Sequence, residues 1–293
     1  MAGHAALDLG RHDLAVLLAG AAVTRQAADG RLGVVEDEAG SVNGAACGEM
    51  VRFAADHTGD PRWRTAATAQ LCWLTDRAPR AADGTLFHLL RQRQVWVDTV
   101  YMVVPLLAAA GRPDLACAQA DGHRRRLFDA GSGLYAAIWD EDAATVTRAD
   151  HWGTGNGWVV AGLARALRQR VDWPTGVAAR LAGHATDVID ACLARRRADG
   201  LFHDVLDDPA TFVETNAAQM LAYAIGTGVA DGWLPARYAG TGRDLHAAAA
   251  TQVDRAGLVR GACGSPDFAR PGTSAEAQAF HLLAAAALRR LAG

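Results

Sequence analysis

Apolar residues recur along most of this chain at the three- and four-residue spacing of an amphipathic helix, whereas the alternation typical of strands is rare. The pattern predicts an all-α protein. The helices that we expect cover residues 11–28, 43–58, 61–76, 94–111, 113–128, 155–171, 177–196, 213–228, 237–254 and 273–291.

Short and long connections alternate between the predicted helices, so that the helices form hairpins. The long connections cover residues 77–93, 129–154, 197–212 and 255–272, and they separate repeats of about sixty residues. A ring of such hairpins places the long loops and the N-termini of the inner helices at one end, where ligands bind. We therefore expect a single domain, residues 1–293, with an (α/α)6-type toroid fold.

The toroid is shortened at its N-terminal side in this prediction, because ten helices fall short of the twelve that six hairpins require. Two arrangements would close the ring. Either residues 29–42 adopt further structure, or another subunit of a homo-oligomer fills the gap.

Composition narrows the range of partners. The net charge is −3, with 51% apolar and 21% charged residues, and this balance lacks the basic face that nucleic acid or an anionic membrane requires. The apolar run from Leu14 to Val23 follows Asp8 and Asp13, which favours a core helix over a secretory signal. Five widely spaced cysteines without a CxxC pair indicate neither a disulfide framework nor a zinc site, so we expect a cytoplasmic protein without metal or cofactor.

One predicted loop has the composition of a sugar-binding site. The segment from His151 to Trp158, HWGTGNGW, holds two indoles and three glycines directly after Asp150. Indole faces stack on the apolar faces of pyranose rings, glycines allow close approach of the backbone, and a carboxylate can bond hydroxyls or move protons. A nucleotide-binding loop is disfavoured, because no strand precedes the glycines and no Lys follows them.

Further polar motifs lie on the same rim. Asp98 stands near the start of a predicted inner helix, in QVWVDTVYM, where it could equally compensate the helix dipole. His203 lies in the loop DGLFHDVLDD, and Glu214 opens the next inner helix, where helix capping is the simpler interpretation. Cys263, in CGSPDF, is expected to be a small buried apolar side chain.

Taken together, WVDTVYMVVP, HWGTGNGW, DGLFHDVLDD, ETNAAQMLAYAI and CGSPDF...PGTSAEAQAF resemble the unsaturated rhamnogalacturonyl and glucuronyl hydrolases of glycoside hydrolase families 105 and 88. The resemblance runs from about Val95 to Leu283. It implies an (α/α)6 barrel that removes a Δ4,5-unsaturated uronic acid from the non-reducing end of oligosaccharides left by polysaccharide lyases. In this chemistry an acid protonates C4 of a vinyl ether and water adds at C5.

The resemblance also implies site residues. Asp98 matches the aspartate of the family's WVD motif and would orient water or the C4 region, and Asp150 is the best match to the general acid and base. Thr154 stands where many relatives carry Arg. The side chains expected to contact the oligosaccharide are those of Trp96, Tyr101, His151, Trp152, Asn156, Trp158 and His203.

Two other functions stay open. A catalytically weakened barrel that only binds sugar would agree with Thr154 and the short N-terminal region. A sugar epimerase on the same fold would require pairs of histidines for proton transfer; His88, His151 and His203 lie on predicted rim loops, although none belongs to an epimerase-like motif.

Overall fold

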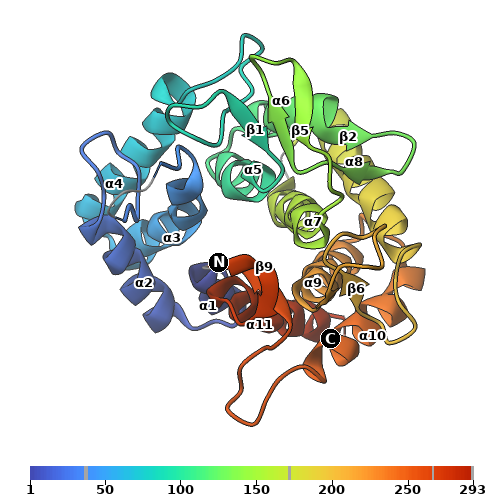
Figure 1. The fold of residues 1–293 in the computed structure, drawn as a ribbon. Coiled ribbons are helices and arrows are strands. Elements are labelled where there is room, and N and C mark those ends of the chain that lie inside the picture. Colours follow the sequence, from blue (N-terminus) through green and yellow to red (C-terminus); the bar gives the residue numbers. More distant parts are fainter. Residues whose placement is uncertain (36–38, 171–172, 266, 292–293) are drawn as a thin grey trace.

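Helices in two concentric layers surround a central axis (Figure 1). The structure, a computed structural model, describes residues 1–35, 39–170, 173–265 and 267–291. Within these residues, the inner layer consists of α1 (Ala2–Asp8), α3 (Gly48–Thr58), α5 (Thr99–Ala109), α7 (Gly153–Leu167), α9 (Asn216–Ala230) and α11 (Ala275–Arg289). The outer layer consists of α2 (His12–Thr24), α4 (Pro61–Cys72), α6 (Pro113–Leu127), α8 (Thr175–Leu193) and α10 (Ala239–Ala250).

The core lies around the inner helices. Each of α5, α7 and α9 packs on the next inner helix around the ring and on the outer helix that follows it in the chain. All residues of α7 are buried, as are ten of the eleven residues of α5. A helix that is apolar on every side requires such two-sided burial, which explains why the apolar sequences of these helices belong to the inner layer.

The sequence-based prediction of an all-α toroid is confirmed, and each of the ten predicted helices corresponds to a helix of the structure. Three short helical segments, η1 (Asn43–Cys47), η2 (Trp73–Arg77) and η4 (Ala236–Tyr238), extend neighbouring α-helices. The predicted starts at residues 94 and 213 were too early, because β1 (Gln94–Trp96) and β7 (Val213–Glu214) precede the helices there.

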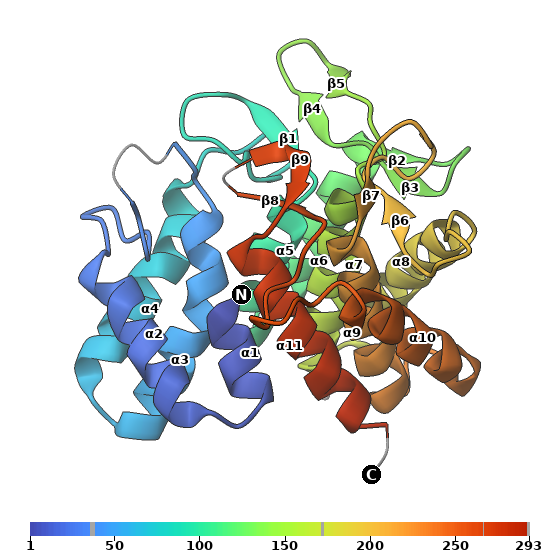
Figure 2. The same ribbon diagram turned by 60° about the horizontal axis from the view of Figure 1, so that its bottom comes forward.

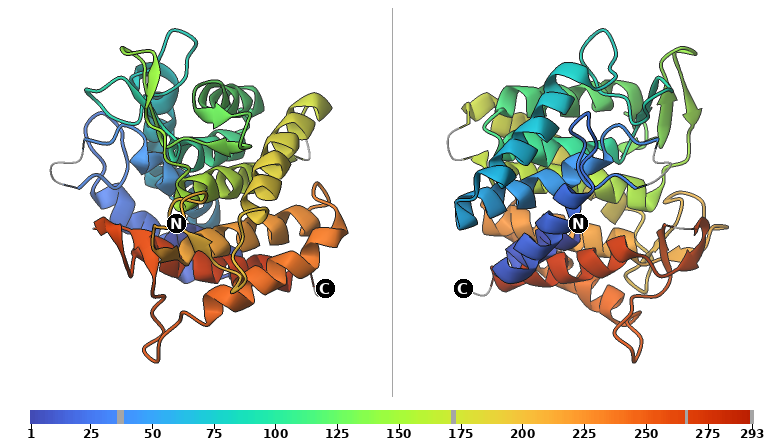
Figure 3. Two further views of the ribbon diagram at one scale, coloured as in Figure 1. Left: turned by 45° about the vertical axis from the view of Figure 1, so that its right-hand side comes forward. Right: turned by 90° about the vertical axis from the view of Figure 1, so that its left-hand side faces the viewer.

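The prediction missed α1, which lies beside α11 and occupies the sixth inner position (Figure 3). Buried ion pairs attach it to the ring. Arg165 of α7 donates to Asp8 at 3.2 Å and to Glu49 at 2.6 Å, and His4 contacts the hydroxyl of Tyr101 at 2.9 Å. With α1, the described residues contain six inner helices. Of residues 29–42, where further structure was expected, 36–38 lie outside the described part of the chain.

The strands gather at one end of the barrel, above the N-termini of α5, α7, α9 and α11 (Figure 2). One sheet has the order β1-β4-β5, with Trp96 opposite Ile138 of β4 (Ile138–Asp140) and Ile138 opposite Arg148 of β5 (Thr145–Arg148). The remaining strands form two-stranded ladders: β2 (Phe128–Asp129) with β3 (Leu134–Tyr135), β6 (Phe202–His203) with β7, and β8 (Ala262–Gly264) with β9 (Asp267–Gly272).

None of the described helices combines the length and the apolar character needed to cross a bilayer. All five cysteines are free thiols.

Candidate functional site

A pocket of about 310 Å³ opens on the rim that carries the strands. Four segments form it: the turn from β1 into α5, strands β4 and β5, the start of α7, and β9. The lining residues are Trp96, Val97, Asp98, Ala137, Ile138, Arg148, Trp152 and Phe268. Three of the sequence-predicted site residues, Trp96, Asp98 and Trp152, therefore meet in one pocket.

Asp98 is the acidic residue of this lining. It directly precedes α5, its side chain is 19% exposed, and its Oδ1 atom is buried without a hydrogen-bond partner among the described residues. The Nδ1 atom of His88 lies 3.4 Å from this oxygen and 2.9 Å from the hydroxyl of Thr99. The imidazole of His88 also stacks on the indole of Trp96. A carboxyl oxygen without a partner is costly to bury, so Asp98 is available to interact with a ligand.

Trp152 forms a second aromatic wall. It is 8% exposed, and its indole Nε1 donates to the Sγ atom of Cys263 at 3.3 Å. The ring of Phe268, which is half exposed, meets the indole nearly edge-on at 6.0 Å. Cys263 itself is fully buried, and burial raises the pKa of its thiol. The thiol thus remains protonated and fixes the indole, as expected for a buried apolar side chain.

Arg148 is the cation among the described residues that line the pocket. Its guanidinium carbon lies 5.7 Å from the centre of the Trp152 ring, and its Nε donates to Oδ2 of Asp150 at 3.1 Å. Asp150 is not part of the lining, and its side chain is 53% exposed. The structure therefore does not place Asp150 in the pocket with Asp98, and its carboxylate forms an ion pair with Arg148 instead.

Two buried carboxyl groups lie behind the Trp152 wall. Burial raises the pKa of Asp204, and its Oδ1 atom has no hydrogen-bond partner in the described part of the chain. Burial also raises the pKa of Glu214 to about 7, although its carboxylate accepts from the backbone N–H groups of Asn216, Ala217 and Cys263. Glu214 thus caps α9, as the simpler interpretation of its sequence predicted.

Three predicted contact residues belong to the core instead of the pocket. Tyr101 and Trp158 pack edge-on against each other at 4.9 Å, and both also contact Phe280. Asn156 is fully buried, and its amide bonds both the N–H and the carbonyl of Tyr135 and the carbonyl of Trp152. Tyr101 and Asn156 bond their polar groups inside the protein, and Trp158 is buried in the core, so we do not retain these residues as substrate contacts.

The two predicted rim histidines also point elsewhere. His151 contacts Asp207 through Nδ1 at 2.5 Å and Ser132 through Nε2 at 3.3 Å. His203 contacts Arg197 at 2.8 Å and the carbonyl of Thr211 at 3.0 Å. Neither residue lines the pocket. His151 joins its loop to Asp207 of the next rim loop, and His203 is held by residues of its own loop.

The glycines after Trp152 have a packing role that differs from the one predicted. They form the first turns of α7, which begins at Gly153, two residues before the predicted helix start at 155. A Cβ atom on Gly155 would lie 2.7 Å from the Trp152 ring and 2.9 Å from Val97, and one on Gly157 would collide with Met220. These glycines let α7 approach α9 and the pocket wall closely, and they do not face a ligand.

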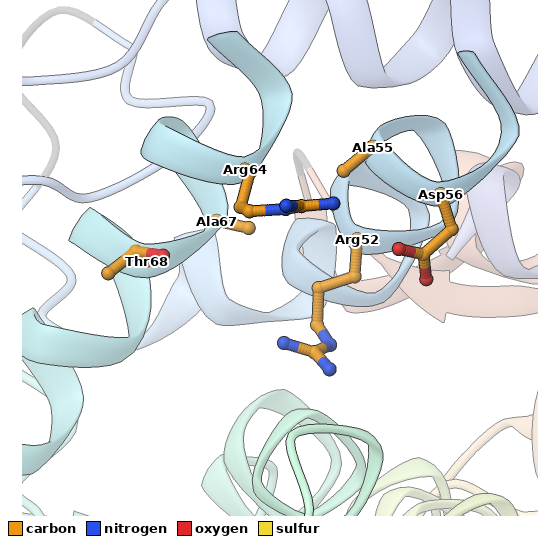
Figure 4. A pocket seen from close by; sticks show the side chains of 6 residues that line it. All are labelled: Arg52, Ala55, Asp56, Arg64, Ala67 and Thr68. Atoms are coloured by element: carbon orange, nitrogen blue, oxygen red, sulfur yellow. The ribbon is translucent and has the colours of Figure 1, made fainter. Parts of the chain in front are cut away.

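A second hollow, of about 240 Å³, lies between α3 and α4 (Figure 4). Figure 4 shows the side chain of Arg64 extending from α4 towards α3. The residues that line this hollow include no aromatic side chain and none of the predicted site residues. The hollow is lined by Arg52, Ala55, Asp56, Arg64, Ala67 and Thr68. The rim pocket is therefore the candidate site.

Sequence reasoning missed Arg148, Phe268 and His88 as parts of the candidate site. Arg148 lies between the motif that ends at Pro105 and the one that begins at His151, and Phe268 comes from the last rim loop. His88 was considered only as a residue for an epimerase. His88 and Asp98 are separated in the chain by a turn and β1, so no helical or strand periodicity indicated that they are in contact.

The chain is similar to known glycoside hydrolases. Residues 17–278 match the model of Glycosyl Hydrolase Family 88. Over 199 residues, the chain is 28% identical to the unsaturated rhamnogalacturonyl hydrolase YesR of Bacillus subtilis (strain 168), an alignment that covers 63% of this chain and 57% of YesR. The chain thus spans little more than half the length of that relative.

Solved structures share the fold. A glycoside hydrolase from family 105 of C. acetobutylicum ATCC 824 superposes with a TM-score of 0.79 at 20% identity, covering 93% of this chain and 86% of that chain. The unsaturated glucuronyl hydrolase of Bacillus sp. GL1 gives a TM-score of 0.58 at 14% identity, covering 96% of this chain and 95% of that chain. Because the family model matches most of its length, this chain belongs to glycosyl hydrolase family 88.

Proposed function

We propose that this protein removes a Δ4,5-unsaturated uronic acid from the non-reducing end of short oligosaccharides that polysaccharide lyases release, including those from rhamnogalacturonan. The observation that carries the proposal is the buried carboxyl oxygen of Asp98, which forms no hydrogen bond with the described residues and lies in a pocket walled by Trp96 and Trp152. Membership of family 88 and the similarity to an unsaturated rhamnogalacturonyl hydrolase support it.

The pocket suits a single sugar ring. Its volume of about 310 Å³ lies at the lower end of the range of roughly 300–1,000 Å³ that small-molecule sites occupy. Indole faces bind the apolar faces of pyranose rings, and the half-exposed Phe268 extends the aromatic surface to the mouth of the pocket. An exo-acting enzyme that accepts one terminal residue requires a pocket of this kind.

The reaction begins with proton transfer to carbon. In its acid form, Asp98 donates a proton to C4 of the C4=C5 double bond, and the positive charge that develops is shared between C5 and the ring oxygen. Water then adds at C5 and returns one proton to the Asp98 carboxylate. The C5 hemiketal opens by breaking the bond to the ring oxygen, which leaves a ketone at C5 and a hemiacetal at C1. Collapse of the hemiacetal releases the remaining oligosaccharide, and one water molecule is consumed.

Asp98 acts as both acid and base in this scheme, because Asp150 is not among the residues that line the pocket. His88 positions Asp98 through the 3.4 Å contact to its Oδ1 atom. Proton transfer by a positioned side chain contributes about 10²- to 10⁴-fold to rate. Loss of the Asp98 carboxyl group should therefore lower kcat by a factor of this size.

An absorbance assay tests the proposal. Hydration removes the C4=C5 double bond, so turnover bleaches the ultraviolet absorbance of unsaturated galacturonyl-rhamnose, glucuronyl or ulvan-type disaccharides. We expect Asp98→Asn to lower kcat by about 10²- to 10⁴-fold. Asp60→Asn is the matched control, because Asp60 precedes α4 as Asp98 precedes α5 but lies far from the pocket.

Absence of bleaching with all three disaccharides would overturn the proposed reaction. Calorimetric binding of the same disaccharides without turnover would instead favour the sugar-binding alternative. The epimerase alternative has little support in the geometry, since His151 and His203 do not line the pocket with Asp98.

A further inference from the structure

We propose that Arg148, positioned by Asp150, binds the carboxylate of the terminal uronyl ring and makes the enzyme selective for the free acid over its ester. This inference rests on the proposed function, because it assigns the group that recognises the acidic part of that substrate. The carrying observation is the presence of the Arg148 guanidinium in the same pocket as Asp98.

The charge in the pocket calls for such a cation. Among the described lining residues, Asp98 and Arg148 are the charged side chains, so the pocket itself is close to neutral. A uronate adds a negative charge close to Asp98. Without a cation, repulsion between the two carboxylates would oppose binding whenever Asp98 is ionised. Arg148 compensates the incoming charge and leaves Asp98 to react.

The hydrogen bonds of Arg148 leave part of its guanidinium available. Only Nε is engaged with Asp150, at 3.1 Å, and the terminal nitrogens have no recorded hydrogen bond within the described residues. Arginine presents five N–H donors in a planar fork that matches a carboxylate. The side chain is 42% exposed, so it borders the mouth of the pocket where a ligand carboxylate could reach it.

Two contacts limit the orientation of that fork. Arg148 lies beside Ile138 across the β4–β5 ladder, and its guanidinium lies 5.7 Å from the centre of the Trp152 indole. Asp150, two residues further on, accepts a hydrogen bond from Nε. The terminal nitrogens are therefore directed by the strand, the indole and Asp150 together. Asp150 is a positioning residue in this arrangement, since it does not line the pocket.

The test compares an unsaturated uronyl disaccharide with its methyl ester, because both contain the double bond that turnover bleaches but only the free acid carries the charge. We expect Arg148→Met to lower kcat/KM for the free acid by about 10- to 100-fold, mainly through KM, and that for the ester by less than about threefold. Arg148→Lys keeps the charge but loses the planar fork, so its kcat/KM for the free acid should lie between those of the wild type and Arg148→Met.

The role of Asp150 is tested by rescue. Asp150→Ala should lower the acid-to-ester ratio of kcat/KM by about threefold or more, because Arg148 loses its orienting acceptor. Asp150→Asn keeps an oxygen that accepts from Nε and should restore most of the ratio. The matched controls are Arg11→Met and Asp13→Asn, an exposed pair with the same spacing and a 3.1 Å Nε contact outside the pocket. They should leave the ratio unchanged.

The outcomes separate this inference from the proposed function. If the wild-type protein bleaches neither substrate, the proposed function fails. If it bleaches the free acid but Arg148→Met reduces acid and ester turnover equally, the reaction stands and the assignment of Arg148 is overturned. An unchanged ratio in Asp150→Ala would overturn the positioning role of Asp150.

Discussion

The imidazole of His88 lies parallel to the indole of Trp96, with ring centroids 4.6 Å apart and planes inclined by 5°. The same imidazole contacts Asp98 and Thr99 at the start of α5. One side chain therefore contacts both an aromatic wall of the pocket and the carboxyl group that we propose to react. His88, a loop residue, thus contacts both strand β1 and the start of helix α5, which follow each other directly in the chain.

We expect His88→Ala to lower kcat about tenfold or more, because a small displacement of the reacting group costs much of its positioning. KM should rise as well, since Trp96 loses its stacking partner. Steady-state kinetics in the bleaching assay measure both effects. His57→Ala is the control, because His57 also stacks on an aromatic ring, that of Phe53 at 5.2 Å, outside the pocket. Unchanged kinetics in His88→Ala would contradict a positioning role.

Gly155→Ala tests the packing role of the α7 glycines. Its Cβ atom would meet Trp152 and Val97 at less than 3 Å, and overpacking of a core costs about 1–3 kcal/mol. Gly183→Ala in α8 has open space around its Cβ atom, so there the better helix propensity of Ala should stabilise by up to about 1 kcal/mol. Urea unfolding should thus show opposite signs for the two variants. Destabilisation of equal size in both would show that the crowding at Gly155 has no effect.

The sequence predicts the helical ring well, because inner and outer helices carry apolar residues at helical spacing over many turns. It did not predict α1, whose seven residues are too few to show a period and whose attachment depends on the distant Arg165. The rim strands escaped prediction for a similar reason: they are two to six residues long and are held by pairing between loops.

The candidate site was partly predictable. Asp98, Trp96 and Trp152 belong to motifs at the starts of inner helices, and the ring brings these starts together. The same motifs include Tyr101, Asn156 and Trp158, which the helical turn directs into the core. Proximity in a motif therefore does not separate residues that face the ligand from those that face a neighbouring helix. Arg148 and Asp150 depend on the β4–β5 ladder, which the sequence did not reveal.

Glu214 should make stability depend on pH. Burial raises its pKa from 4.5 to about 7 in the folded protein, so the folded state holds the proton more tightly than the unfolded chain. Its contribution to stability is fully present below the unfolded pKa and is lost as the pH rises through about 7. The raised pKa of Asp204 acts in the same direction. The loss attributable to Glu214 is of the order of 3 kcal/mol.

Thermal unfolding of the wild type and Glu214→Gln between pH 4.5 and 8 measures the pH-dependent contribution of Glu214 to stability. Glutamine does not titrate, so the decrease in Tm with rising pH should be smaller in the variant, although its overall Tm can be lower because one backbone N–H loses its acceptor. Parallel Tm profiles for the two proteins would contradict the assignment to Glu214.

Arg165 should be the most sensitive charged residue for folding. It is buried, and it joins α7 to Asp8 of α1 and Glu49 of α3 across the centre of the ring. Arg165→Met leaves Glu49 without its arginine partner and Asp8 with Arg168 as its remaining cation, and breaking a buried pair in this way costs about 3–5 kcal/mol. Arg180→Met is the control, because Arg180 is largely exposed in its ion pair with Asp121, and such surface pairs contribute about 0–1 kcal/mol.

Urea unfolding followed by circular dichroism gives the two free energies, and a further variant identifies their cause. Adding Glu49→Gln to Arg165→Met removes the carboxylate that has lost its arginine, so we expect the double variant to recover part of the lost stability. If the loss came only from the missing arginine side chain and its packing, the added change would not restore it. Recovery would show that the charge balance around Arg165, and not the shape of one side chain, carries its effect on folding.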